Sequence, residues 1–341
     1  MKAAVAPRAS LTTPLLSRRL TVSGPFELAQ ALAFLRGFLP AGGSASGPCG
    51  SASGRSGGDC YRAAHVIAGR PLAIEVSQEP DGLLLRLAGP GASAAHLFEA
   101  EELTRRVFSL DLDGALFQRQ VGKADKVIAG LQRRFPGLRP VLFSTPFEAA
   151  CWAVLSQRTR MSQAAHLRSK LVAALGPKVM MDGHVLTACP APEHVLAAGG
   201  ALAGVVGVSE VKATRIQRLA ERGQRGDFDP RLLREMRDER ARAWLEQSPG
   251  IGAWTSEFVL IRGVGRPDLL PRGEWRLLSA VQRYYDLAER PTFEDLERLG
   301  RGWEGFRSWA AFLLRAALHI DTRGIGAGGA TDPSTGGRRR P

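Results

Sequence analysis

A short glycine-rich run constrains this chain more than any other feature of its sequence. The run reads Ser248-Pro249-Gly250-Ile251-Gly252-Ala253-Trp254-Thr255. Residues 238–247 before it and residues 254–261 after it place apolar side chains near helical spacing. The run therefore predicts a tight turn that joins one helix directly to the next.

Two glycines in this turn, Gly250 and Gly252, suit it to ligand binding. Without a Cβ, each can adopt positive φ and let the backbone approach a ligand closely. The first N–H groups of the following helix lack partners within the helix and lie at the positive end of its dipole, which favours an anion such as a DNA phosphate. A plain helix connector is the alternative, and the turn taken alone favours it.

Further motifs stand at set distances from the turn. They are Thr145-Pro146-Phe147-Glu148, Trp152-Ala153-Val154-Leu155-Ser156-Gln157, Arg262-Gly263, and Trp303 with Arg307-Ser308-Trp309-Ala310. In order and spacing the set resembles the helix-hairpin-helix DNA glycosylase superfamily, and most closely the bacterial DNA-3-methyladenine glycosylase II family, whose members remove alkylated bases. The resemblance covers roughly residues 26–319 and is weaker before residue 103.

The resemblance implies an α+β fold, in which a small antiparallel β-rich N-terminal domain precedes a mostly α-helical, two-lobed glycosylase core. Alternation in residues 72–76, a turn at residues 80–82 and a returning apolar run predict the strands. We expect a basic arm over 1–23, the β-rich domain over 24–94 with a flexible Gly/Ser loop at 41–58, the core over 95–320 with the hairpin at 248–255, and a disordered tail over 321–341.

From residue 95 onward the pattern is helical to the end of the core. Thr145 is expected to cap one helix in a Thr-x-x-Glu capping box. Another helix carries a basic row, Lys212, Arg215, Arg218 and Arg222, which indicates either DNA contact or a solvated face. Besides the segments that flank the turn, the predicted helices are 100–109, 122–135, 147–155, 161–175, 192–198, 209–222 and 230–236.

Charge and hydropathy narrow the class of protein. The chain has 341 residues and a net charge of +13, which favours a polyanionic partner because neutralised phosphates release counterions. No apolar stretch approaches the ~20 residues of a membrane span, and residues 1–20 lack the apolar core and cleavage site of a signal peptide, so we expect none. We expect a monomeric, cytoplasmic, nucleoid-associated protein. Its expected partner is double-stranded DNA with damaged bases, and we expect it not to bind a membrane.

The cysteines and histidines predict neither a metal nor another cofactor. No paired short spacing suggests zinc, and the four-cysteine iron–sulfur loop of some superfamily members is absent. The cysteines are Cys49, Cys60, Cys151 and Cys189.

By resemblance, Glu274 in the run Pro271-Arg272-Gly273-Glu274 is the catalytic carboxylate at the head of a third helix. Cleavage of an N-glycosidic bond builds positive charge on the sugar, which such a carboxylate stabilises while it orients or deprotonates water. The family normally has aspartate here. Glutamate moves the charge outward by one methylene and caps helices poorly, so Gly273 is expected to cap instead. The alternative is an ordinary first-turn acid.

Aromatic side chains are expected to line a base pocket. Trp254 occupies the position where bifunctional superfamily members carry a Schiff-base lysine, which implies a monofunctional hydrolase without lyase activity. Trp254 and Phe258 would hold a cationic methylated base, although core packing is a strong alternative for Phe258. Trp275 and Trp309 are expected to be structural. Arg315 falls where some relatives have an aromatic residue, which implies a different substrate range.

A second loop, after the Trp152 motif, is expected to fill the gap left by a flipped base. Arginine there can stack on bases and also contact phosphates, whereas a plain surface loop is the alternative. The expected DNA-binding residues are Gly250, Ile251, Gly252, Trp254, Thr255, Gln157 and Arg158.

Two functions remain open from the sequence. One is a monofunctional DNA glycosylase of base-excision repair that removes 3-methyladenine or 7-methylguanine by base flipping and hydrolysis. The other is a catalytically silent relative that recognises distorted duplex, suggested by Glu274 and Arg315. Sequence-specific regulation is disfavoured, because phosphate contacts carry no base code.

Overall fold

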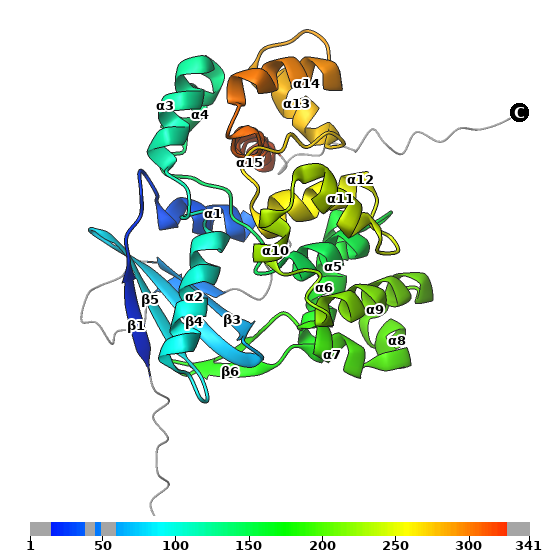
Figure 1. The fold of residues 1–341 in the computed structure, drawn as a ribbon. Helices are drawn as coiled ribbons and strands as arrows, with labels where there is room; N and C mark the ends of the chain where they lie inside the picture. The colour runs from blue at the N-terminus through cyan, green and yellow to red at the C-terminus, as the bar shows by residue number, and fades with distance from the viewer. Residues whose placement is uncertain (1–14, 38–44, 49–58, 326–341) are drawn as a thin grey trace, which may run out of the picture.

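The computed structural model describes residues 15–37, 45–48 and 59–325, and it contains a β-sheet domain and two helical lobes (Figure 1). The sheet lies at the lower left of Figure 1, the first lobe at the right and the second lobe at the top. A small antiparallel domain thus precedes a mostly helical core, which confirms the predicted α+β class.

The sheet domain is antiparallel and has helices packed on it. Its short β3–β4 turn, Ala68-Gly69, has positive φ at both residues, as a type I′ hairpin turn requires. The strands lie in the order β1-β5-β4-β3-β2. The elements are β1 (Leu16–Leu20), α1 (Leu28–Gly37), β2 (Ala45–Pro48), β3 (Asp59–Ile67), β4 (Arg70–Glu79), β5 (Gly82–Ala88) and α2 (Ala94–Val107).

The first lobe is continuous in sequence and has its own hydrophobic core. At its centre is α5, which is buried on all sides and begins at the predicted Thr145 cap. Its elements are α5 (Pro146–Ser156), α6 (Met161–Leu175), α7 (Pro192–Ala197), η3 (Gly199–Ala201), α8 (Leu202–Val206), α9 (Glu210–Gln224), α10 (Pro230–Glu235), α11 (Asp238–Glu246), α12 (Ala253–Val259) and the π-helical turn η4 (Leu260–Val264).

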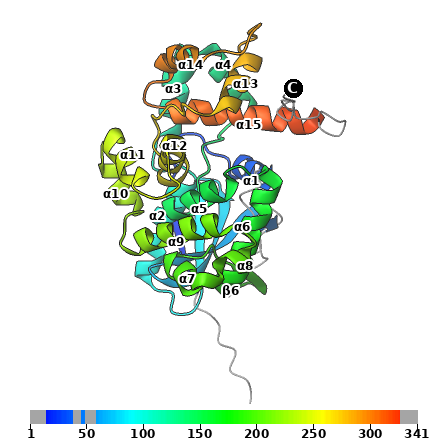
Figure 2. The ribbon, with the colours of Figure 1, turned by 90° about the vertical axis from the view of Figure 1, so that its right-hand side faces the viewer.

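The second lobe combines two segments that are far apart in the sequence. Figure 2 shows α15 crossing below the other helices of this lobe. The lobe shares one hydrophobic core with the sheet domain. Its elements are α3 (Gly114–Ala124), α4 (Lys126–Arg134), α13 (Trp275–Tyr284), α14 (Phe293–Gly300), η5 (Arg301–Trp303) and α15 (Arg307–Ile325). None of the helices in the described ranges is long and apolar enough to cross a bilayer.

The structure corrects the predictions for the N-terminal arm, the Gly/Ser loop and the C-terminal tail. Residues 16–20 of the expected arm form β1, because they pair in register with β5. Residues 45–48 of the expected flexible loop form β2 against β3. Helix α15 extends to residue 325 and so enters the expected tail. The remaining residues of the arm, loop and tail lie outside the described ranges.

Two helix predictions are also wrong. The helix expected over 122–135 is divided at Asp125, whose side chain caps α4 by accepting from the N–H groups of Val127 and Ile128. The core is not helical throughout, because β6 (Lys178–Met181) and β7 (His184–Thr187) form a hairpin. The hairpin buries apolar side chains against the sheet, a long-range contact that local periodicity does not report.

One buried arginine joins the sheet domain to the helical lobes. Arg139 is 2% exposed, and burial lowers its pKa to about 10. Its guanidinium lies near the rings of Phe26 and Trp309. Its nitrogens donate to five carbonyl oxygens at 2.6–3.2 Å, those of Ser23, Gly24, Pro25, Ser109 and Leu112.

We predict that Arg139→Met lowers the free energy of unfolding by about 3 kcal/mol, because buried carbonyl groups lose their donor while the side-chain volume is retained. Urea unfolding followed by circular dichroism measures the change. The matched control is Arg133→Met, at an exposed position on α4. Equal stability of the two variants would contradict the joining role of Arg139.

Candidate active site

A cavity of about 530 Å³ lies between the two lobes. The first lobe contributes side chains from α5, α12 and η4, and the second contributes α13 and α15. Phe34 of α1 reaches it from the sheet domain. The structure thus brings together Trp254 and Phe258 of α12, Glu274 at the start of α13 and Arg315 of α15.

Two stacked rings form one wall of this cavity. Trp254 and Phe258 have ring centroids 5.3 Å apart and planes inclined by 18°. Phe258 also packs edge-on against Phe143, at 5.9 Å, so it belongs to the cavity wall and to the first-lobe core. Trp254 is 40% exposed, so its ring remains accessible from solvent.

Gly273 allows the ring of Trp254 to lie close to the loop that precedes Glu274. A Cβ at Gly273 would come within 2.7 Å of Cδ1 of Trp254. The expectation that Gly273 caps α13 is wrong. Glu274 is itself the N-cap, because its longer side chain folds back and Oε1 accepts from the N–H of Arg276 at 3.2 Å. The helix N-terminus therefore stabilises and orients this carboxylate.

Two arginines accompany the Glu274 carboxylate. Nε of Arg315 lies 3.9 Å from its Oε1. Burial lowers the pKa of Arg315, and the negative charge of Glu274 opposes this shift. Arg262 donates to the carbonyl of Val141 at 2.8 Å, and burial together with the charge of Arg315 lowers its pKa to about 10. The rings of Phe34, Phe143 and Phe312 lie 5.8–5.9 Å from its guanidinium carbon.

The sequence interpretation missed a second carboxylate at the cavity. Glu257 is buried, and its Oε2 accepts from the N–H of Arg272 at 3.1 Å. Its Oε1 lies 3.6 Å from the guanidinium of Arg242. Glu257 thus fixes the loop that leads to Glu274. Its signal in the sequence is a single acid within the short α12 segment, AWTSEFV.

The two tryptophans expected to be structural differ. Trp309 is buried in the core that the second lobe shares with the sheet, as expected. Trp275 is 54% exposed and lines the cavity, with the guanidinium carbons of Arg276 and Arg290 at 5.1 and 6.0 Å from its ring centre. The expectation for Trp275 is therefore wrong.

The predicted turn between two helices is present, between α11 and α12. Gly250 has φ of +89°, whereas Gly252 is extended at −109°, so only the first glycine needs the left-handed region. The side chains of Ile251 and Thr255 are buried. Of the turn residues expected to bind DNA, these two can offer a ligand only backbone groups, whereas Gly252 and Trp254 are exposed.

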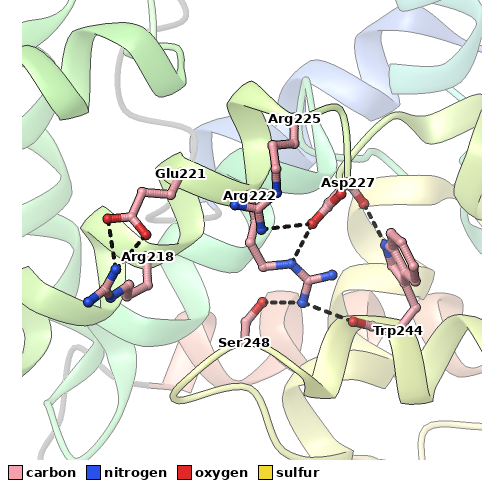
Figure 3. Close-up of polar contacts among 7 residues, drawn as sticks. All are labelled: Arg218, Glu221, Arg222, Arg225, Asp227, Trp244 and Ser248. Atoms are coloured by element: carbon pink, nitrogen blue, oxygen red, sulfur yellow. Dashed lines mark hydrogen bonds and ion pairs between the residues drawn. The ribbon is translucent and has the colours of Figure 1, made fainter.

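Arg222 of α9 supports the start of the turn (Figure 3). Its Nη1 donates to Oγ of Ser248 at 2.8 Å and to the carbonyl of Trp244 at 2.9 Å, and its Nε pairs with Asp227 at 2.6 Å. Arg218, on the same helix, pairs with Glu221. The basic row of α9 is therefore not a uniform solvated face, because Arg222 is buried.

The loop between α5 and α6 reaches the same turn. Nε2 of Gln157 donates to the carbonyl of Gly250 at 2.7 Å, and its Oε1 accepts from Arg215 at 2.8 Å. Arg158 follows at φ of +51° and is exposed. The structure thus places Gln157 inside a hydrogen-bonded junction and Arg158 at the exposed tip of the loop.

Within the described residues, no cluster of three or more histidine, cysteine or acidic side chains could hold a metal ion. Burial raises the pKa of the Cys151 and Cys189 thiols, which disfavours the reactive thiolates. Cys49 lies outside the described residues.

Comparison with known proteins shows which fold and which relatives this chain resembles. No family model matches this chain. It shares its fold with the 3-methyladenine DNA-glycosylase of Archaeoglobus fulgidus, with a TM-score of 0.73 at 23% identity over 87% of this chain and 97% of that one. That fold is the helix-hairpin-helix DNA glycosylase fold.

Two bacterial relatives agree with this class. The chain is 26% identical over 225 residues to the DNA-3-methyladenine glycosylase of Bacillus subtilis, covering 65% of this chain and 74% of the relative. It is 24% identical over 206 residues to DNA-3-methyladenine glycosylase 2 of Escherichia coli, covering 60% and 67%. In sequence and fold, this chain thus resembles DNA-3-methyladenine glycosylases of the helix-hairpin-helix superfamily.

Proposed function

We propose that this protein is a monofunctional DNA glycosylase of base-excision repair that removes alkylated bases of the 3-methyladenine and 7-methylguanine type from double-stranded DNA. The observation that carries this proposal is the position of Glu274. Its carboxylate caps α13 at the wall of a cavity that also contains the stacked rings of Trp254 and Phe258. Similarity to proteins named DNA-3-methyladenine glycosylase supports the same activity.

The cavity has the parts that hydrolysis of an N-glycosidic bond requires. An alkylated purine carries positive charge and leaves readily, so no general acid is needed. Its face would stack on Trp254 and Phe258, whose π systems attract a cation. As the C1′–N bond breaks, its electron pair leaves with the base. Glu274 stabilises the oxocarbenium-like sugar, and water adds at C1′ and loses a proton to the carboxylate or to solvent.

The turn and the α5–α6 loop would hold the DNA around this cavity. A phosphate fits against Gly252, where the exposed N-cap of α12 has no side chain to obstruct its approach. Arg158 is the residue that we assign to the gap left by the flipped base, since its guanidinium is exposed and can stack on neighbouring bases. Gln157 is engaged by Gly250 and Arg215 and would act through its hydrogen bonds.

Binding without catalysis is the second candidate function. It is favoured by one specific contact, because Arg315 lies 3.9 Å from the Glu274 carboxylate and partly offsets its charge. Its guanidinium also makes the cavity less favourable for a cationic base. The two candidates share the same DNA-binding surface, so only a measurement of base release separates them.

We predict that the parent protein releases 3-methyladenine or 7-methylguanine from methylated duplex DNA and that Glu274→Gln lowers the rate about a hundredfold or more, because the charge is lost. The glutamine oxygen can still accept from the N–H of Arg276, so the helix cap is retained. Single-turnover release measured by chromatography gives the rates, and Glu304→Gln, at a 75% exposed side chain, is the control.

Two outcomes would decide against catalysis. Absence of release from a broad panel of damaged bases would remove the enzymatic proposal. An inactive parent that gains activity on Glu274→Asp substitution would establish the second candidate, since the shorter side chain would then supply a missing geometry.

The phosphate contact is tested at Gly252. We predict that Gly252→Glu weakens duplex binding about tenfold or more, because a carboxylate would oppose the phosphate. Gly252→Ala is the matched control, since a Cβ at this position meets nothing within 4 Å. Fluorescence anisotropy at moderate salt gives Kd, and thermal unfolding verifies both folds. If the two variants bind equally well, the phosphate does not lie at this turn.

The monofunctional assignment concerns the product left on DNA. The segment from Gly250 to Val281 contains no lysine, and Trp254 has no amine to attack the sugar. Borohydride added during turnover should trap no protein–DNA adduct, and strands should break only after alkali or an abasic endonuclease. Efficient trapping, or prompt cleavage by the purified protein, would require an amine elsewhere, such as that of Lys212.

A further inference from the structure

One amide side chain joins the two loops that flank the cavity. Gln157 donates from Nε2 to the carbonyl of Gly250 and accepts at Oε1 from Nη1 of Arg215, at 2.7 and 2.8 Å. A carbonyl on one side and a guanidinium on the other fix the orientation of the amide, because a flipped amide would lose both bonds. The α5–α6 loop therefore has one preferred register on the turn.

Lys212 of α9 forms hydrogen bonds with the same loop. Its Nζ donates to the carbonyl of Leu155 at 2.8 Å and to Oγ1 of Thr159 at 2.6 Å. Oγ1 of Thr159 in turn donates to the carbonyl of Gln157 at 3.0 Å. An ammonium at the last turn of α5 also satisfies a carbonyl that the helix leaves without a partner.

The loop needs this support because its tip is strained. Arg158 has φ of +51°, a left-handed conformation that non-glycine residues rarely adopt. Such a residue persists only where its surroundings hold it. The bonds of Gln157 on one side and of Thr159 on the other hold the exposed Arg158 in place.

Helix α9 also contacts the first part of the 248–255 turn at two points. A Cβ at Gly250 would lie 2.6 Å from Cδ of Arg215, so the turn packs directly on the arginine stem. Two helical turns further along, Arg222 donates to Ser248 at the start of the turn (Figure 3). One face of α9 thus contacts both loops.

We propose that Arg215 and Lys212 are positioning residues, which hold the α5–α6 loop and the 248–255 turn at one fixed spacing. This inference rests on the proposed function, in which Arg158 fills the gap of the flipped nucleotide while the turn grips a phosphate. When this spacing is fixed, binding of the phosphate at the turn places Arg158 beside the stacked bases of the duplex. When the spacing is not fixed, the protein still binds duplex but inserts Arg158 poorly between the bases.

The test separates insertion from binding. Arg215→Met keeps the stem that packs under Gly250 and removes the donor to Gln157. The control is Arg218→Met, on the same helix at an exposed side chain paired with Glu221. Three quantities are measured for each protein: Kd for a duplex, the fluorescence of 2-aminopurine beside an abasic-site analogue, and single-turnover release from methylated duplex.

For Arg215→Met we expect release and the 2-aminopurine signal to fall about tenfold or more, whereas Kd rises less than about threefold and the melting temperature is close to that of the control. Arg215→Lys should recover part of the loss. Gln157→Leu should reproduce it, and the double variant should be no worse than either single one, because both remove the same junction. Lys212→Met should show the same pattern.

Unchanged release and fluorescence in Arg215→Met would overturn the inference, and so would a proportional loss of binding, release and thermal stability, which indicates a merely structural residue. The proposed function fails separately. A parent that releases no base but gives a fluorescence signal that Arg215→Met loses would support the positioning role and refute the glycosylase. A parent with neither signal would refute both.

Discussion

The guanidinium of Arg139 is the contact on which the arrangement of the domains depends. It lies where the sheet domain meets the helical lobes, and the carbonyl groups that converge on it come from the segment after β1 and from the α2–α3 connection. A buried charge tolerates such a site only when its donors are satisfied, so these segments have little freedom to move apart. The same contact fixes the approach to α1, which carries Phe34 into the cavity.

Local patterns predicted the parts of this molecule that local interactions determine. The helix over residues 161–175, the Thr145 cap and the turn at Gly250 follow from periodicity, capping chemistry and glycine. That Trp254 and Glu274 lie at one site was predicted only from resemblance to a family. The β6–β7 hairpin was missed because its apolar face is satisfied only by a distant sheet. Glu257 was missed because its partners come from other segments.

Positive charge in this chain is a poor guide to where DNA would lie. Several arginines form buried ion pairs with carboxylates. Examples are Arg62 and Arg86 with Glu75 in the sheet, and Arg168 with Glu148 in the first lobe. In α9 the basic row serves mainly to hold loops. The net charge still attracts a polyanion at long range. Direct contact, however, requires exposed side chains, and a row of basic residues in the sequence does not show which of them are exposed.

The close approach of Gly273 to the ring of Trp254 links two positions that no sequence pattern connects. A side chain at residue 273 would occupy the volume of the indole, and a slimmer residue at 254 would vacate it. Substitutions at the two positions are therefore not independent. An exchange of tryptophan for lysine would place an amine at the cavity wall, and it would also open space beside Gly273 and remove a packing contact of the loop before Glu274. The volume at residue 273 and the side chain at residue 254 are thus matched to each other, although the glycine itself has no functional group.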